Sequence, residues 1–485
     1  MFVSTRETAE RPPHVDYAEA VLGGAPTTNK GLYVLDEIPQ FALGELRALE
    51  AEPYYWMSGH VQDMLAPGIP MRLMKAITRE AYSPDVFTKQ QNGIVTPVEQ
   101  IDDNLFVLRL GDGPTRAFKD VALQFLGRMM DHLLEVRGKH LDIVTATSGD
   151  TGSAAIEAVR LSDRLRIAVF SPKEGMTPVQ AGQMGIRTDG EQVHNLRVDG
   201  NFDDCQDIVK AVMAEPAFAE HFGAMNSINW GRIAAQVPYS VAGYLQTIQQ
   251  AGVPFGTPID IVVPTGNFGD ALSVYYAKHM GVPIRKVIIA TNENDVMHRA
   301  IQTGVYSQGE VEVTTSPSMD IGKASNFERL VYEILGRDPL MTAAYMDDFE
   351  TKGVAQFRDF NIGNLVLRLG GEFGSGASSH EARVRTIQQV YGNGKKYIID
   401  PHTADGVYVA YSQTKRDIPT LVFSTADPVK FEGIIGEALG QENIPTRDPE
   451  FIGIERGLEK GFINIPRSVV VAKHYLDEHF LQKAA

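Results

Sequence analysis

The stretch 105-LFVLRLGDGPTRAFKDVALQFLGRMMDHLL-134 decides the fold class of this chain. It begins with the apolar run Leu105–Leu110, continues through a polar loop rich in Gly, and ends in a segment whose apolar residues repeat at helical spacing. A strand, a polar loop and an amphipathic helix in this order predict a βα unit. We expect the helix over Phe118–Leu134, with Lys119 just beside its apolar stripe.

The same order recurs along the chain. The run Ile143–Thr147 leads into a predicted helix over Thr151–Leu161, and Ile259–Pro264 leads into one over Ala271–Met280. Strands this continuous in Val, Ile and Leu are usually buried on both faces, which indicates parallel sheets covered by helices. The predicted fold class is therefore α/β, doubly wound, with mostly parallel sheets. Further strands are expected at Leu165–Phe170, Tyr397–Ile399 and Leu421–Phe423.

Length and rhythm divide the chain into several units. A chain of 485 residues exceeds one compact core, and ~150 residues per domain suggests about three folding units. Helical segments such as Asp16–Leu22 and Phe41–Leu49 lack the βα rhythm, so we expect a separate N-terminal domain there. The predicted bounds are 1–100 for that domain, 101–305 for the α/β core with a substrate subdomain at about 140–225, 306–394 for a mainly helical insertion, 395–445 for completion of the core, and 446–485 for a C-terminal tail.

Composition restricts the partners and the location. The net charge of −16 repels nucleic acids and anionic lipid surfaces, and the sequence shows no basic patch that would overcome it. Cys205 is the single cysteine, which excludes an internal disulfide and a thiolate metal cluster and favours a reducing compartment. No secretory leader or membrane-length apolar run stands out. We expect a cytoplasmic protein without metal, nucleic-acid or membrane partners, as a monomer or small homo-oligomer.

Four polar loops follow predicted strands. Ligands bind open α/β sheets at the carboxyl ends of strands, where helix N-termini attract anions. None of the four has the GxxxxGK[ST] spacing of a nucleotide P-loop, and none gives GxGxxG at the start of a helix after a strand. The loops are 111-GDGPTRAFKD-120, 147-TSGDTG-152, 264-PTGNFGD-270 and 424-STADP-428.

Each loop residue has a plain alternative when taken alone. Lys119 could be a solvated lysine in a first helical turn or, if desolvated, an amine that forms a Schiff base. The glycines around Gly266 could only relieve strain in a strand-to-helix turn. Ser148 and Thr151 could simply cap a helix. Arg232 could pair with one of the many acidic residues. Spacing alone does not choose between these readings.

Together the loops resemble the threonine synthase family of fold type II pyridoxal-phosphate enzymes. The resemblance runs in order over nearly the whole chain, so it is more specific than any single loop. The matching segments are GPTRAFKD (113–120), TSGDTGSAA (147–155), FDDCQDIVK (202–210), NSINWGRIAAQ (226–236), PTGNFGD (264–270), ATNENDVMHR (290–299), SPSMDI (316–321), SNFERL (325–330) and DPHTADG (400–406), together with STR (4–6) and GLYV (31–34) near the start.

The resemblance implies a role for each matching position. Lys119 would carry pyridoxal 5'-phosphate as a Schiff base and move protons between Cα and Cβ of the substrate. Thr425 would face the pyridine nitrogen of the cofactor. The cofactor phosphate would lie against the N–H groups at a helix start. The residues implied there are Gly266, Asn267, Phe268 and Gly269, with Asp270 placed among the cofactor-binding residues.

The same resemblance implies a substrate site. Thr147, Ser148, Asp150 and Thr151 would surround the substrate carboxylate, although for Asp150 a local structural role is the favoured interpretation. The substrate phosphate would be bound by Asn226, Ser227 and Arg232, with Gln236 behind them.

The implied reaction is the conversion of O-phosphohomoserine and water to threonine and phosphate. Threonine dehydratase, cysteine synthase and a non-catalytic sensor of phosphorylated amino acids remain as alternatives. Asp112 departs from the family pattern, since a histidine is expected there in many members. Cys205 is expected to be a packed thiol.

Overall fold

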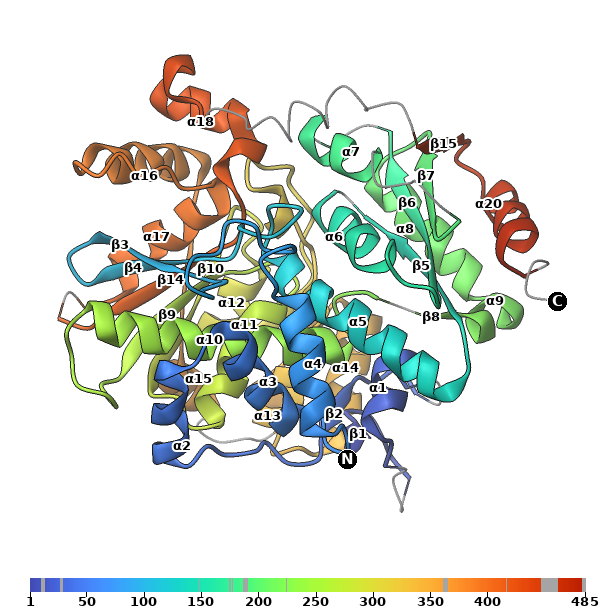
Figure 1. Ribbon diagram of the computed structural model, residues 1–485, viewed down its shortest axis with the longest axis horizontal. Helices are drawn as coiled ribbons and strands as arrows, with labels where there is room; N and C mark the ends of the chain where they lie inside the picture. The colour runs from blue at the N-terminus through green and yellow to red at the C-terminus, as the bar shows by residue number, and fades with distance from the viewer. Residues whose placement is uncertain are drawn as a thin grey trace.

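The chain folds into two mostly parallel β-sheets that lie side by side, each covered by helices (Figure 1). The predicted α/β, doubly wound fold class is confirmed. This computed structural model describes residues 1–9, 14–26, 29–147, 149–173, 176, 178–185, 191–223, 225–360, 365–415, 417–445 and 461–481.

The larger sheet has six strands in the order β13-β10-β9-β14-β4-β3. Neighbouring strands are parallel except β3 and β4, which pair antiparallel. The strands are β3 (Val98–Asp102), β4 (Leu105–Arg109), β9 (Ile259–Pro264), β10 (Ile284–Thr291), β13 (Phe373–Ala377) and β14 (Thr420–Ser424).

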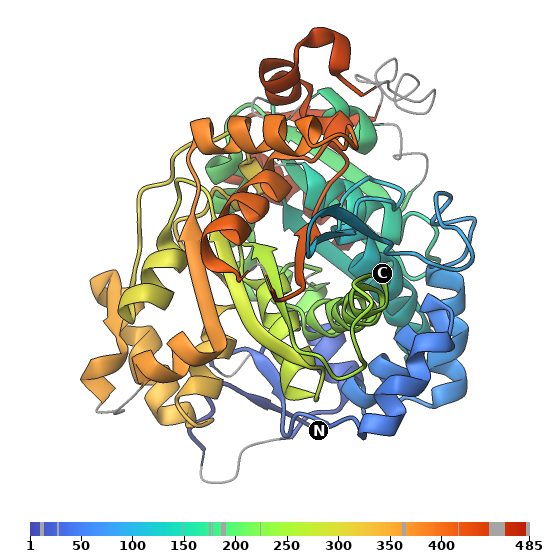
Figure 2. The same ribbon diagram turned by 90° about the vertical axis from the view of Figure 1, so that its left-hand side faces the viewer.

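Helices cover both faces of the larger sheet (Figure 2). They are α5 (Lys119–Arg137), α10 (Trp230–Gln250) and α11 (Gly269–His279) on one side, and α16 (His380–Gly392), α17 (Pro401–Gln413) and α18 (Glu432–Leu439) on the other. Because side chains alternate along a strand, Ile261 and Val263 of β9 pack in the apolar cluster of α10 and α11, whereas Val262 packs in that of α16 and α17.

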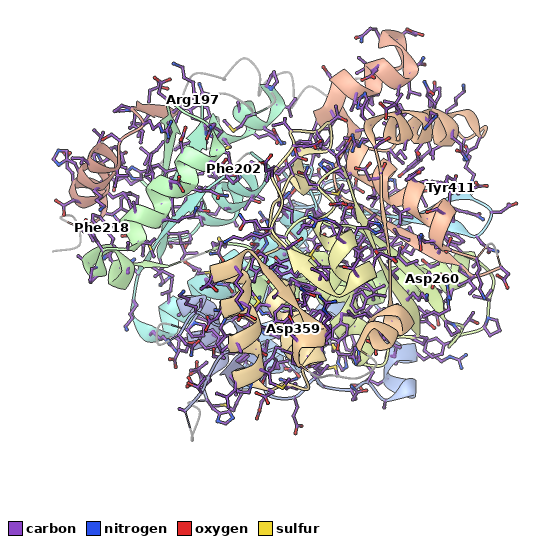
Figure 3. The ribbon with its side chains drawn as sticks, turned by 180° about the vertical axis from the view of Figure 1, so that it is seen from behind. Arg197, Phe202, Phe218, Asp260, Asp359 and Tyr411 are labelled. Carbon is purple, nitrogen blue, oxygen red and sulfur yellow. The ribbon has the colours of Figure 1, made fainter. Side chains whose placement is uncertain are left out.

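The smaller sheet has five strands in the order β15-β7-β6-β5-β8, all parallel. Seen from behind, Arg197 of β7 and Phe218 of α9 lie on this half of the molecule, and Asp260 of β9 lies on the other half (Figure 3). The strands are β5 (Leu141–Ala146), β6 (Leu165–Pro172), β7 (Val193–Val198), β8 (Phe222–Gly223) and β15 (Phe462–Ile465). The helices are α6 (Asp150–Val159), α7 (Pro178–Gly185), α8 (Phe202–Met213), α9 (Pro216–His221) and α20 (Val469–Leu476), followed by a π-helical turn, η6 (Asp477–Leu481).

The N-terminal residues share the main apolar cluster of the larger sheet. Phe2 is fully buried, and its ring lies 5.4 Å from that of Trp230 in α10. Helices α3 and α4 pack against α10 and α5. This segment contains β1 (Phe2–Ser4), α1 (Tyr17–Gly23), β2 (Tyr33–Leu35), α2 (Leu43–Ala48), η1 (Leu49–Ala51), α3 (Tyr54–Leu65) and α4 (Met71–Ala81).

The segment 306–394 was predicted to be mainly helical, but it also contributes β13, an edge strand of the larger sheet. The sequence of β13, FGSGA, has few β-branched residues. Its glycines serve packing instead, since a Cβ on Gly376 would lie 3.0 Å from Val409 of α17. Two elements lead into this region, α12 (Val296–Thr303) and β11 (Val305–Ser307). Within it lie η2 (Pro317–Met319), α13 (Phe327–Ile334), α14 (Pro339–Lys352), β12 (Val354–Gln356), η3 (Phe357–Phe360) and α15 (Leu365–Glu372).

The strand predicted at Tyr397–Ile399 is wrong, because these residues form no regular element. Ile399 is nevertheless buried in the cluster of α16 and α17. The apolar run is explained by this packing rather than by strand pairing. Two short elements complete the C-terminal part, η4 (Pro428–Phe431) and η5 (Gln441–Asn443).

No helix in the described part of the chain is long and apolar enough to span a membrane. Within the same residues, no three or more His, Cys, Asp or Glu side chains are grouped so that they could bind a metal ion.

The burial of Phe2 gives a test of how the N-terminal segment contributes to stability. Phe2→Ala removes a ring that packs on Trp230 and Tyr17, so we expect a loss of about 3–5 kcal/mol in the free energy of unfolding. Val470→Ala is the control, because Val470 is 77% exposed and should change stability by less than about 0.5 kcal/mol. Chemical denaturation measures both, and equal effects would contradict a shared core.

Candidate active site

Loops at the carboxyl ends of both sheets bring their side chains together. The larger sheet contributes the loops after β4, β9 and β14, and the smaller sheet contributes the loop between β5 and α6. These are the four polar loops singled out in the sequence. Their contact is direct, since Asp150 at the start of α6 lies 3.6 Å from the Nζ of Lys119 at the start of α5.

Lys119 is a buried amine whose ion-pair partner among the described residues, Asp150, lies 3.6 Å from its Nζ. Its side chain is only 10% exposed, and its Nζ lies 4.7 Å from the ring centroid of Phe118. Burial lowers the pKa of Lys119; Asp150 opposes this, and the positive charges of Arg232 and Lys430 lower the pKa further. A solvated first-turn lysine therefore does not describe this residue. A buried amine with a lowered pKa is suited to attack a carbonyl.

Asp150 is held by donors from both halves of the molecule. Its Oδ1 accepts hydrogen bonds from Lys430 Nζ (2.6 Å) and Gln180 Nε2 (3.0 Å), and its Oδ2 accepts one from Ser318 Oγ (3.3 Å). Burial alone would raise the pKa of Asp150, but Lys430 and Lys119 outweigh it and hold the pKa well below its usual range. Asp150 is therefore a carboxylate anion that fixes the loop, as the structural interpretation of the sequence expected.

The turn between β9 and α11 presents backbone donors to the site. Phe268 has a φ of 66° in the left-handed region, directly before the first turn of α11. The N–H groups of Gly266, Asn267 and Phe268 donate to no group among the described residues. Gly266 fits closely under the neighbouring loop, because a Cβ there would lie 2.7 Å from the carbonyl oxygen of Ser318. Free N–H groups at a helix start form an anion site.

Arg232 provides a second anion site beside the first. Its side chain is 4% exposed, and its Nη1 has no hydrogen-bond partner among the described residues. The carboxylate of Asp270 acts on its charge, and Asp270 Oδ1 accepts hydrogen bonds from Gln236 Nε2 (2.6 Å) and from the Tyr239 hydroxyl. Burial raises the pKa of Asp270 to about 6. A buried guanidinium with an unused donor is favourable only if an anion completes it.

The segment 325–329 supports both anion sites from behind. Ser325 Oγ lies 3.0 Å from Ser227 Oγ and donates to Asn267 Oδ1 (3.2 Å). Asn326 Nδ2 donates to the carbonyl oxygens of Ser227 (2.9 Å) and Asn267 (3.2 Å). Arg329 in turn donates to Asn326 Oδ1 (2.6 Å). These contacts fix the loop before α10 relative to the turn before α11.

Comparison with known proteins agrees with this geometry. Residues 91–352, more than half of the chain, match the family model described as pyridoxal-phosphate dependent enzyme, and residues 403–475 match the one described as threonine synthase, C-terminal. Threonine synthase from Methylobacillus glycogenes is 38% identical over 99% of both chains. The chain belongs to the threonine synthase family.

Solved structures of this family have the same fold. The crystal structure of PLP-bound threonine synthase from Brucella melitensis superposes with a TM-score of 0.89 at 37% identity, covering 99% of both chains. Threonine synthase from yeast gives 0.89 at 32% identity with the same coverage. The expected cofactor, pyridoxal 5'-phosphate, is confirmed by the family.

The residues present fit this cofactor of the threonine synthase family. The N–H groups of Gly266, Asn267 and Phe268 suit its phosphate, and the buried amine of Lys119 suits its aldehyde. Thr425 is buried directly after β14, and its carbonyl oxygen accepts from the N–H of Phe118 (2.8 Å). This bond holds the Thr425 loop beside Lys119.

Of the other predicted site residues, Thr147 and Asn226 form hydrogen bonds within their own loops. The hydroxyl of Thr147 accepts from the N–H groups of Gly149 (3.0 Å) and Gly152 (2.8 Å), so it shapes its own loop. Asn226 Oδ1 accepts from the N–H of Ile228 (3.1 Å). Thr151 is half-buried in the first turn of α6, and Ser148 lies outside the described residues.

Two residues outside the predicted site have clear surroundings. Asp112 is buried and accepts a hydrogen bond from Arg109 (2.7 Å), although burial raises its pKa. Cys205 is a free, buried cysteine whose pKa is raised to about 12 by burial, which confirms the packed thiol.

Several residues at the site had no assigned role in the sequence analysis. Lys430 lies five residues after Thr425, and its position in the loop after β14 was the only signal that could have indicated it. Ser325, Asn326 and Arg329 belong to the segment SNFERL, which was recognised without a function. Their contacts join loops that are far apart in the sequence, so spacing could not reveal them.

The close fit of Gly266 predicts an effect on cofactor affinity. In Gly266→Ala the new Cβ would meet the Ser318 carbonyl oxygen, and overpacking of this kind costs about 1–3 kcal/mol. The turn must shift, so we expect affinity for pyridoxal phosphate to fall about 5- to 100-fold in a titration followed by visible absorbance. Gly433→Ala, whose Cβ would meet nothing within 4 Å, should bind as the wild type does. Equal affinities for both variants would contradict the phosphate turn.

Proposed function

We propose that this chain is a threonine synthase that converts O-phospho-L-homoserine and water to L-threonine and inorganic phosphate. The observation that carries the proposal is the buried guanidinium of Arg232, whose Nη1 has no partner in the described part of the chain, beside the anion-binding turn before α11. One anion site suffices for the cofactor phosphate. The second supports a substrate that carries a phosphate of its own.

The cofactor, when bound, supplies a sink for the electrons left at the substrate Cα when its proton is removed. Lys119 removes that proton and later returns one to Cα, which its lowered pKa permits. Arg232 donates to the substrate phosphate and stabilises it as charge grows on its leaving oxygen. Asn226 and Ser227 position the same phosphate from the loop before α10.

The remaining residues hold this arrangement. Asp150 anchors the loop of residues 147–152, which lies against the substrate carboxylate through Thr147, Ser148 and Thr151. Asp270 holds the orientation of α11 through Gln236 and Tyr239. Thr425 faces the pyridine nitrogen of the cofactor, where a hydroxyl favours a neutral ring.

The domain bounds and cellular setting are also part of the proposal. We propose the domain bounds given by the sequence as segments of the chain, of which 1–100 packs in the core of the larger sheet and 306–394 adds the strand β13 to it. The tail at 446–485 is only partly within the described residues. The net charge of −16 and the single cysteine support a cytoplasmic enzyme that acts on a small molecule, as a monomer or small homo-oligomer and without nucleic-acid or membrane partners.

Lys119→Ala tests the assignment of the lysine. The variant should bind pyridoxal phosphate only reversibly, so borohydride treatment should no longer attach the cofactor to the peptide containing position 119. Threonine formation should fall at least about 10²–10⁴-fold, since a proton-transfer group is lost. Lys210→Ala, at an exposed lysine of α8, is the control. Attachment of the cofactor at another lysine in the wild type would overturn the assignment.

Arg232→Gln tests the substrate phosphate site. We expect threonine and phosphate release from O-phosphohomoserine to fall about 10²–10³-fold in kcat, because the leaving phosphate loses its charged donor, while the visible absorbance of the bound cofactor is retained. Arg232→Lys keeps the positive charge but lacks the paired donors of a guanidinium, so its kcat should lie between those of the wild type and Arg232→Gln. Unchanged kcat/KM in Arg232→Gln would contradict the assignment, and a wild type that binds cofactor but forms no threonine would contradict the substrate.

A further inference from the structure

Lys430 is a fully buried lysine beside Lys119, and it has no role in the proposed reaction. It lies in η4, directly after the loop that carries Thr425. Its ammonium donates to Asp150 Oδ1 at 2.6 Å and to the carbonyl oxygen of Thr115 at 3.0 Å, and its side chain is 0% exposed. A buried ammonium is costly unless it is paired, so its position between these two partners calls for an explanation.

The hydrogen bond from Lys430 to Thr115 connects Lys430 to the start of the helix that carries Lys119. Thr115 donates through its N–H (2.8 Å) and its hydroxyl (2.6 Å) to the carboxylate of Asp120, the residue after Lys119. The Thr115 carbonyl oxygen also accepts from Gln183 Nε2 (3.0 Å). Lys430 therefore helps to hold the turn from which the helix of Lys119 begins.

The ion pair between Lys430 and Asp150 affects the electrostatic surroundings of Lys119. Lys430 is the closest cation to Asp150, at 2.6 Å, whereas Lys119 Nζ stays 3.6 Å from Oδ2. Hydrogen bonds from Gln180 and Ser318 occupy the carboxylate further. Asp150 therefore pairs with two cations, and Lys430 is the closer of the two.

We propose that Lys430 is a positioning residue for Lys119, which occupies the carboxylate of Asp150 and so leaves the Lys119 amine able to lose its proton and attach to the cofactor. The inference rests on the proposed role of Lys119 and not on the identity of the substrate. Without Lys430, Lys119 would lose a repelling charge and would no longer share its ion-pair partner Asp150 with a second cation. Both changes stabilise the protonated amine.

The charged groups that act on Lys119 define the expected signs. Asp150 of α6 and Asp270 of α11 raise its pKa, while Arg232 of α10 and Lys430 of η4 lower it. Variants at Asp150 and Lys430 leave Arg232 and Asp270 in place. The two remaining groups are therefore a constant background.

The experiment measures the pKa of the Lys119 amine itself. The full-length chain, freed of cofactor with hydroxylamine, is labelled with trace acetic anhydride across a pH range, and modification of Lys119 is followed by peptide mass spectrometry. In Lys430→Met we expect the midpoint to rise by about 1–3 pH units. Each unit lowers the reactive fraction below the midpoint about tenfold, so attachment of added pyridoxal phosphate should slow accordingly. Lys430→Arg should keep a midpoint near that of the wild type.

A control separates this effect from the loss of another hydrogen-bonded lysine. Lys278 is half-buried and donates to two carbonyl oxygens, those of Ile284 (2.6 Å) and Arg285 (3.0 Å), at the far end of α11. Lys278→Met should leave the Lys119 midpoint unchanged. An unshifted midpoint in Lys430→Met, or an equal shift in Lys278→Met, would overturn the proposal.

A second pair of variants keeps the test valid if Lys430→Met does not fold. Lys430→Gln, which keeps a hydrogen-bond donor for Asp150 without the charge, should also raise the Lys119 midpoint, whereas Asp150→Asn should lower it below that of the wild type. Equal midpoints in these two variants would overturn the proposal. Labelling requires no substrate, so its outcome is independent of whether threonine is formed.

Discussion

The buried carboxylate of Asp150 is the interaction on which the arrangement of the site depends. It belongs to the first turn of α6 on the smaller sheet, yet Lys430 and Ser318 bind it from the larger half. A buried charge must be paired to be stable. The two sheets are therefore fixed relative to each other at the place where their loops meet, and Lys119 lies beside this connection.

The second constraint is the difference in hydrogen bonding between two buried cations, Lys430 and Arg232. Lys430 donates hydrogen bonds to Asp150 and to the Thr115 carbonyl oxygen, whereas the Nη1 of Arg232 has no partner among the described residues. The first cation supports the fold of the loops, and the second is left for an anion. Together with the free N–H groups before α11, this difference supports the proposal that one site receives both a phosphorylated cofactor and a phosphorylated substrate.

Much of this could be predicted from the sequence. The βα units at β4, β5, β9 and β14 were found within a few residues, because buried parallel strands are continuous apolar runs. The strand β13 was missed because glycines replace β-branched residues where α17 packs closely. The strand expected at Tyr397–Ile399 was wrong because an apolar run can pack against a core, here mainly through the buried Ile399, without pairing as a strand. Local pattern does not distinguish these cases.

By itself, the sequence determined the fold class, the four functional loops, the family and the positions of Lys119 and Arg232, since each depends on local residue order or on a family motif. Only the tertiary structure decided which of these side chains is paired. Asp150 turned out to bind Lys430, 280 residues away, and Ser325 to Arg329 to support two loops at once. Burial and ion pairing depend on the packing of distant segments, and together they shift the pKa of the Lys119 amine.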